Sequence, residues 1–163
     1  MNEICRITRK YGPLAARILL AQLFIVSGIG KIGGFAGTAA FMASAGLPFA
    51  PVLLVFTIAL EVGGGILLVA GWQARWVATA FCGFTFLSAV IFHPFWNSDA
   101  ASVFGQMNNF MKNLAIMGGM LYVMAYGAGP FSLSTDQCES DSLPENPREK
   151  VRVYKKIRTI DME

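Results

Sequence analysis

Residues 51–72 read PVLLVFTIALEVGGGILLVAGW and contain a single charged side chain, Glu61. At 1.5 Å per residue, a helix of this length reaches roughly 33 Å, which is enough to cross the hydrocarbon core of a bilayer. The segment is therefore predicted to be a membrane-spanning helix, and the rest of the chain is interpreted outward from it.

The same scarcity of charge extends over most of the chain. Hydrophobic residues make up 55% of the sequence and charged residues 14%. Residues 11–130 contain only six charged side chains, which are Arg17, Lys31, Glu61, Arg75, Asp99 and Lys112. A soluble core cannot absorb so long a stretch and still present a wettable surface. The pattern excludes a soluble enzyme, a secreted disulfide scaffold and a disordered chain. A net charge of +3 without a folded basic patch also argues against a nucleic-acid partner.

Further apolar segments accompany this one, at 13–30, 76–92 and 110–128. Pro13 suits the first turn of a helix, so the first span is expected to begin there. Pro94 ends the third span, and the Gly129-Pro130 pair ends the fourth. Arg17 interrupts the first apolar run and no cleavage site follows it closely, so we expect a retained span rather than a signal peptide.

We therefore expect an all-α membrane protein, a four-transmembrane-helix bundle in contact with the lipid bilayer. Lys and Arg near the span ends favour a cytoplasmic N-terminus and a cytoplasmic C-terminus, N-in/C-in. Phe35, Ala39 and Met42 share one helical face, which predicts a short interfacial helix between spans one and two. The expected domains are a cytoplasmic N-terminal segment, the transmembrane domain and a polar, charged cytoplasmic tail, at 1–12, 13–133 and 134–163.

Cysteine and histidine usage excludes several redox centres within the chain. The cysteines Cys5, Cys82 and Cys138 are isolated, so no C-x-x-C pair is present for a thiol–disulfide relay. His93 is the single histidine, which rules out a haem held by two histidines of one chain. We expect no haem, iron–sulfur or metal site.

Polar and small side chains form a stripe on each predicted helix. In span two, Gly64 and Gly65 share the face of Glu61 and would let another helix approach closely. The stripe of span one consists of Arg17, Ala21, Phe24, Gly28 and Lys31. That of span three consists of Arg75, Thr79, Cys82, Phe86, Ala89 and His93. Span four opens with Asn108, Asn109, Lys112 and Asn113.

Turned inward, the stripes would enclose a small cavity near the outer face, with Glu61 at mid-depth. An acidic residue there costs about 2.5–3.5 kcal/mol on insertion scales, so Glu61 must face protein or water and be paired or protonated. We take Glu61 and His93 as the candidate catalytic residues. The candidate ligand-binding residues are Lys31, Asn109, Lys112 and Asn113. Such a cavity suits an anionic or carbonyl-bearing small molecule.

Each candidate also has a purely structural interpretation. Glu61 paired with Arg17 or Lys112 would only fix the helix register, and we expect Arg17 and Arg75 to act in structural charge pairing. His93 would cap the end of its helix. The lysines would be snorkelling anchors, and the asparagines would cap a helix or hydrogen-bond between helices.

The order of several short motifs resembles the DoxX family of small bacterial membrane proteins over roughly residues 13–133. The motifs are Arg17 followed by SGIGK at 27–31, GLP at 46–48, EVGG at 61–64, the turn from Gly71 to Arg75, FHP at 92–94, MNNFMKNLAIMGG at 107–119 and GAGPFSL at 127–133. The family usually closes on Ser-Leu-Asp, where this chain has Ser132-Leu133-Ser134. The tail beyond is not matched.

The resemblance implies a multi-pass protein of the bacterial cytoplasmic (inner) membrane with a link to redox systems. Relatives resemble the small subunit of a thiosulfate:quinone oxidoreductase, or partners of oxidative-stress proteins. This favours a non-autonomous subunit of a quinone-linked or stress-related oxidoreductase, with quinone as the candidate cofactor and a soluble or membrane redox protein as the partner. A non-catalytic scaffold for such a partner and a small-solute or proton-coupled transporter stay open, as does a homo-oligomer.

Overall fold

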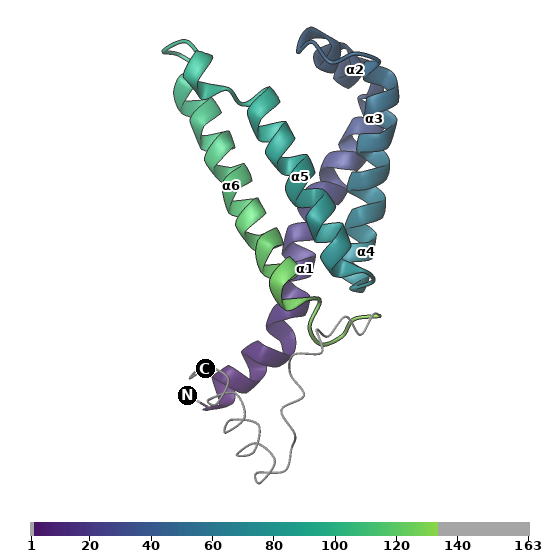
Figure 1. The fold of residues 1–163 in the computed structure, drawn as a ribbon, viewed down its shortest axis with the longest axis vertical. Coiled ribbons are helices and arrows are strands. Elements are labelled where there is room, and N and C mark those ends of the chain that lie inside the picture. The colour runs from purple at the N-terminus through teal and green to yellow at the C-terminus, as the bar shows by residue number, and fades with distance from the viewer. Residues whose placement is uncertain (1, 134–163) are drawn as a thin grey trace, which may run out of the picture.

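The computed structural model describes residues 2–133, which fold into helices joined by short connections (Figure 1). In chain order the elements are α1 (Asn2–Gly33), α2 (Phe35–Ser44), α3 (Ala50–Ile58), the π-helix η1 (Ala59–Gly64), α4 (Gly65–Ala70), α5 (Ala74–Phe92), the 3-10 helix η2 (Phe95–Asn97) and α6 (Val103–Tyr126). Residues 2–133 contain no strand. The expected tail at 134–163 lies outside the described residues.

Three helical stretches within residues 2–133 are long and apolar enough to cross a membrane. They are Glu3–Gly33, Ala50–Ala70 and Ala74–Asn97. The second joins α3, η1 and α4 into one continuous helical run. The 24 residues of α6 would reach about 36 Å, but its opening turns are rich in Asn and α6 is not among the three. The all-helical membrane class is confirmed, and the fourth span stays a prediction.

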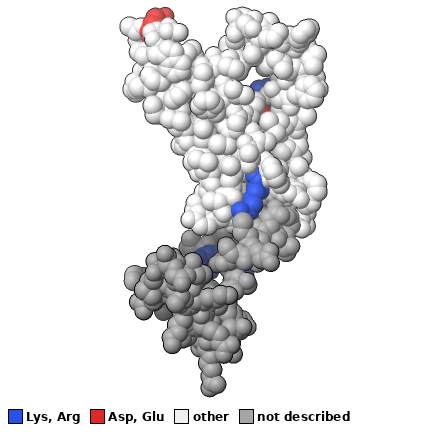
Figure 2. All heavy atoms as spheres, in the orientation of Figure 1, with Lys and Arg blue, Asp and Glu red and all other residues white. Residues whose placement is uncertain are grey.

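The outer surface of the helices is apolar. The side chains of Val26, Phe56 and Trp76 are 69%, 68% and 74% exposed, and many other large hydrophobic side chains are exposed with them. Figure 2 shows one face of the molecule on which charged atoms occupy only a few places. A surface of this composition is stable against lipid tails rather than against water.

The main core lies where α1, α4, α5 and α6 meet. The rings of Phe24 and Phe81 stack there with centroids 3.9 Å apart. A Cβ atom built on Gly65 would lie 2.5 Å from the Ile25 side chain, and Gly64 packs against the Phe81 ring. The close approach predicted at these two glycines is confirmed, because only a hydrogen in place of a side chain leaves room for the neighbouring helix.

A second, smaller core joins α2 to α3. Met42, Ala50 and Leu54 are buried in it, and Phe35 and Ala39 pack against them. The predicted helix between the first two spans is confirmed, and it buries the face that was predicted. Its depth at the membrane interface stays a prediction.

Two predictions about helix ends and faces are wrong. The first helix begins at Asn2 rather than at Pro13, which lies inside α1. Pro13 removes one backbone hydrogen bond, and the first turns of α1 run at an angle to the rest of the helix in Figure 1. The buried face of α5 contains Ala78, Phe81 and Thr85, whereas Thr79 and Phe86 of the predicted stripe are exposed.

Candidate functional site

An ion pair joins α1 to η1 inside the membrane-spanning part of the protein. The Lys31 Nζ atom lies 2.8 Å from Glu61 Oε1 and 2.9 Å from Glu61 Oε2. The Ser27 hydroxyl donates a hydrogen bond of 3.4 Å to Oε1. The Glu61 side chain is 4% exposed and that of Lys31 is 24% exposed. Both carboxylate oxygens therefore have a partner in a place where an unpaired charge would be costly.

Local helix geometry positions this pair. Glu61 lies in η1, and π-helical turns within longer helices are frequent at functional sites. Gly28 faces η1 so closely that a Cβ atom built on it would lie 2.7 Å from the Val62 side chain and 3.1 Å from Glu61 Cβ. The absent side chain of Gly28 brings the backbone of α1 against Glu61, one turn before Lys31.

The partner of Glu61 is Lys31, not Arg17 or Lys112 as one interpretation of the sequence had it. Arg17 is 1% exposed and donates to backbone carbonyls instead, at 3.0 Å to Val69 and 2.8 Å to Phe131. Arg75 donates to the Met124 carbonyl at 3.0 Å. Arg17 and Arg75 were expected to pair with charged groups; within residues 2–133, both donate hydrogen bonds to backbone carbonyls near the ends of α4 and α6 instead.

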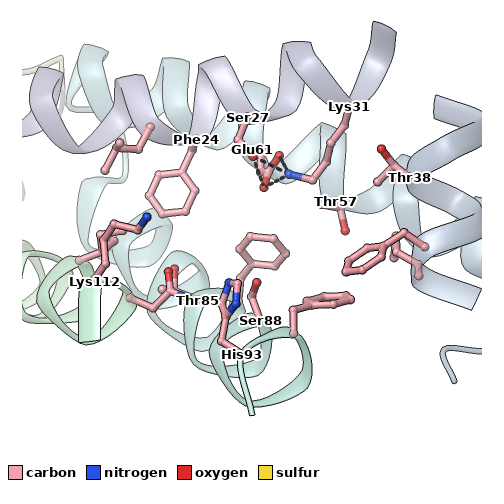
Figure 3. Close-up of a pocket in the computed structure, with 17 residues that line it drawn as sticks. Phe24, Ser27, Lys31, Thr38, Thr57, Glu61, Thr85, Ser88, His93 and Lys112 are labelled. Carbon is pink, nitrogen blue, oxygen red and sulfur yellow. Dashed lines mark hydrogen bonds and ion pairs between the residues drawn. The ribbon is translucent and has the colours of Figure 1, made fainter. Parts of the chain in front are cut away.

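The ion pair forms one wall of a cavity of about 470 Å³ (Figure 3). The cavity is bounded by α1, α2, the α3–η1 run, α5 with the residue that follows it, and α6. Its lining residues are Leu23, Phe24, Ser27, Lys31, Thr38, Phe41, Met42, Thr57, Glu61, Phe84, Thr85, Ser88, Phe92, His93, Lys112, Asn113 and Ile116. It combines apolar rings with hydroxyl, ammonium, carboxylate, amide and imidazole groups.

The opposite wall belongs to α5 and carries an unsatisfied hydroxyl. Thr85 is 3% exposed, and its Oγ1 atom has no hydrogen-bond partner within residues 2–133. Thr85, Ser88 and His93 lie together across the cavity from the Lys31–Glu61 pair in Figure 3. Buried hydroxyls are nearly always paired, so an orphaned one beside a cavity indicates a place for a ligand or water.

The structure brings five of the six predicted catalytic and ligand-binding residues to this one cavity. Glu61, Lys31, His93, Lys112 and Asn113 all line it. The sixth, Asn109, is not a lining residue, but its Oδ1 accepts a hydrogen bond of 3.0 Å from Lys112 Nζ. Whether any of the six acts on a ligand stays a prediction.

Sequence reasoning missed several cavity residues, chiefly Thr85 and Ser88. Residues Ala78, Phe81, Thr85, Ser88 and Phe92 recur at spacings of 3, 4, 3 and 4, which is a helical face as regular as the one that was predicted. The signal was present, but choosing Arg75 and His93 as its anchors rotated the predicted face away from it.

The part of the chain that matches a known family includes most of the residues of this site. The DoxX family matches residues 12–94, which include both partners of the ion pair, Thr85 and His93. The chain belongs to the DoxX family. The match ends before α6, so the residues that α6 contributes to the cavity lie outside it.

Two relatives of this DoxX protein come from Escherichia coli (strain K12). The chain is 41% identical to inner membrane protein YqjF over 122 residues, covering 75% of this chain and 88% of the relative. It is 38% identical to inner membrane protein YphA over 120 residues, covering 74% of this chain and 86% of the relative. No solved structure matches. Together with the three apolar spans, these relatives place the DoxX protein in the inner membrane as a multi-pass protein.

Proposed function

We propose that this DoxX protein is a small membrane subunit of a quinone-linked or stress-related oxidoreductase system, and that its cavity binds the quinone head group. The observation that carries the proposal is a cavity with the Lys31–Glu61 pair on one wall and Thr85, whose buried hydroxyl has no partner within residues 2–133, on the other. A ligand with a flat apolar ring and polar oxygens at its edge satisfies both walls at once.

The size and lining of the cavity support this ligand class. A volume of about 470 Å³ lies within the usual range of small-molecule sites. The aromatic rings of Phe24, Phe41, Phe84 and Phe92 offer apolar faces for a quinone ring. The hydroxyls of Thr85 and Ser88 and the ammonium of Lys112 are donors for its carbonyl oxygens.

In this proposal, different groups transfer the protons and the electrons. Reduction of a quinone takes up two electrons and two protons, and oxidation of the quinol releases them. His93 and Glu61 are the lining groups that exchange protons with the ring oxygens. A partner redox protein exchanges the electrons, so the subunit is not autonomous.

The proposal includes four spans with both ends of the chain in the cytoplasm. Arg6, Arg9 and Lys10 begin α1, and Arg17 and Arg75 contact the segments that close α4 and α6, so five cations gather at the end of the bundle that holds the N-terminus. Lys31 and Lys112 lie toward the other end, at the cavity. An excess of Lys and Arg on one side is typical of the cytoplasmic side.

A proton-coupled carrier is a second candidate, because a buried Lys31–Glu61 pair is the kind of group that proton-linked carriers use. If the protein is such a carrier, the unmodified protein takes up solute into proteoliposomes and the Glu61→Gln variant does not. If it only binds quinone, neither protein takes up solute. The scaffold alternative depends on residues 134–163, which the structure does not describe.

The Thr85→Val variant tests the quinone site with little change of shape. We expect it to weaken binding of a short-chain benzoquinone by about fivefold, as measured by calorimetry on the purified full chain, since one ligand hydrogen bond is lost. The matched control is Thr79→Val, on the same helix but exposed and bonded to the Arg75 carbonyl. Absence of binding to the unmodified protein, or equal losses in both variants, would contradict the proposal.

A further inference from the structure

Gln106 of α6 holds the single histidine of the chain from outside the cavity. The His93 Nδ1 atom lies 2.9 Å from Gln106 Oε1, and Gln106 is not a lining residue. The backbone of His93 is also fixed, because its N–H donates to the Ala89 carbonyl at 3.1 Å and its carbonyl accepts from Phe95 at 2.9 Å. The ring therefore has one edge held by Gln106 and the other edge left for the cavity.

This contact decides where the ring proton lies. With the Gln106 amide oriented so that Oε1 faces the ring, this oxygen is an acceptor only, and Nδ1 of His93 donates to it. In the neutral ring, Nε2 then carries a lone pair and no proton. Within residues 2–133, Nε2 has no hydrogen-bond partner, so the cavity receives a nitrogen that accepts a hydrogen bond rather than one that donates it.

The other polar groups that line the cavity differ from Nε2 in whether they donate or accept hydrogen bonds. The ammonium groups of Lys31 and Lys112 donate only, and the Thr85 hydroxyl does either. The Glu61 carboxylate accepts, but both of its oxygens are already engaged by Lys31. Nε2 of His93 is therefore a ring nitrogen that accepts from a ligand hydroxyl but cannot donate to a ligand carbonyl, whereas the lining hydroxyls of Thr85 and Ser88 can do either.

We infer that Gln106 is a positioning residue that fixes the His93 tautomer, so that the cavity prefers a ring bearing a hydroxyl donor, such as a quinol, over the carbonyl form of the same ring. The inference rests on the proposed quinone site and names the redox form that this site retains. A quinone has no hydrogen to give to Nε2, and its carbonyl oxygen would meet the lone pair of Nε2.

The tautomer can be measured without any ligand. His93 is the only histidine in the chain, so protein labelled with ¹⁵N-histidine and purified on a histidine-free tag gives one pair of ring-nitrogen resonances. At about pH 8 we expect a protonated Nδ1 and a bare Nε2. The Gln106→Glu variant, which keeps the acceptor, preserves this pattern, and Gln106→Leu loses it. A proton on Nε2 in the unmodified protein would overturn the inference.

Ligand preference is the second measurement. We expect an alkylated benzoquinol to bind about fivefold to tenfold more tightly than its dimethyl ether or the corresponding benzoquinone under anaerobic calorimetry. The preference disappears in Gln106→Leu, and persists in Gln106→Glu and in the control Gln22→Leu, whose glutamine is exposed on α1.

Three charged groups share the cavity with His93, namely Lys31 of α1, Glu61 of η1 and Lys112 of α6. Gln106→Leu retains all three, so a loss of the ligand preference in that variant is due to the tautomer and not to these charges. Equal binding of all three ring compounds to the unmodified protein would overturn the inference and leave the quinone site standing. If none of the three compounds binds, the proposed function itself is contradicted.

Discussion

At the scale of single residues, the most informative feature is the Lys31–Glu61 ion pair. The stripe predicted for the first span is confirmed, since Arg17, Ala21, Phe24 and Gly28 are all buried and Lys31 is half-buried beside Glu61. Helical periodicity was enough for this, because it depends on local spacing alone. The partner of Glu61 could not be predicted from the sequence, because Arg17, Lys31 and Lys112 all lie near predicted span ends. Only the packing of the helices determines which of them reaches the carboxylate.

The two partners of this pair are expected to respond unequally to substitution. Lys31→Met leaves a carboxylate that is 4% exposed without its counter-charge and should cost about 3–5 kcal/mol of unfolding free energy. Glu61→Gln leaves an ammonium that is 24% exposed, so its cost should be smaller. Denaturant unfolding in detergent measures both, and the double variant should recover much of the loss. Strictly additive losses in the double variant would argue against a coupled pair.

At the scale of elements, the end of α4 is tied to the segment after α6. Arg17 donates to carbonyls of both, and the Leu133 N–H donates to the Ala70 carbonyl at 3.0 Å. Gly71 makes this possible with φ of +69°, and any Cβ on it would meet Arg17 Nη1 and Ser132. The sequence placed a turn here, but it could not show that a buried guanidinium fills it.

Gly71→Ala is therefore expected to destabilise the protein by more than the 1–2 kcal/mol that a left-handed backbone costs an ordinary residue, because Arg17 must also move. Thermal unfolding in detergent measures the loss. The control is Gly63→Ala in η1, where a Cβ meets nothing within 4 Å and stability should hold or rise. A Gly71→Ala variant as stable as Gly63→Ala would contradict the tie.

Asp99 stabilises the turn before α6 through its hydrogen bonds to Ser102, the residue that precedes the helix. Its carboxylate accepts hydrogen bonds from the Ser102 hydroxyl at 2.6 Å and the Ser102 N–H at 2.9 Å, which lower the pKa of Asp99. Because the pKa of Asp99 is lower in the folded protein, the ionised carboxylate stabilises the fold at pH values above the ordinary carboxyl range. This stabilisation is lost as the pH falls through the lowered pKa. The sequence predicted no role for Asp99, because its hydrogen bonds to Ser102 depend on where α6 begins.

At the scale of the whole molecule, hydropathy predicted the class and most of the spans. The predicted segments at 51–72 and 76–92 correspond closely to Ala50–Ala70 and Ala74–Asn97. Two elements were harder. Pro13 inside α1 suggested a helix start. The first turns of α6 contain Asn108, Asn109, Lys112 and Asn113, of which the last two line the cavity, and these polar residues lower the hydropathy of the helix.

The four-span arrangement predicts a cytoplasmic C-terminus. A fluorescent protein fused after residue 163 should be fluorescent in cells, and alkaline phosphatase fused at the same place should be inactive, because these reporters mature on opposite sides of the inner membrane. The reverse pattern would contradict the arrangement: it would mean either an odd number of spans, with α6 outside the membrane, or four spans in the opposite orientation.

The central claim is that the cavity between the Lys31–Glu61 pair and Thr85 holds a quinone. Mass spectrometry of protein extracted gently from its native membrane measures it directly. We expect quinone in the unmodified protein and in Ala80→Trp, which adds bulk on the exposed side of α5, and its loss from Ser88→Trp, which fills the cavity. Unmodified protein without quinone, or equal amounts in all three proteins, would contradict the claim.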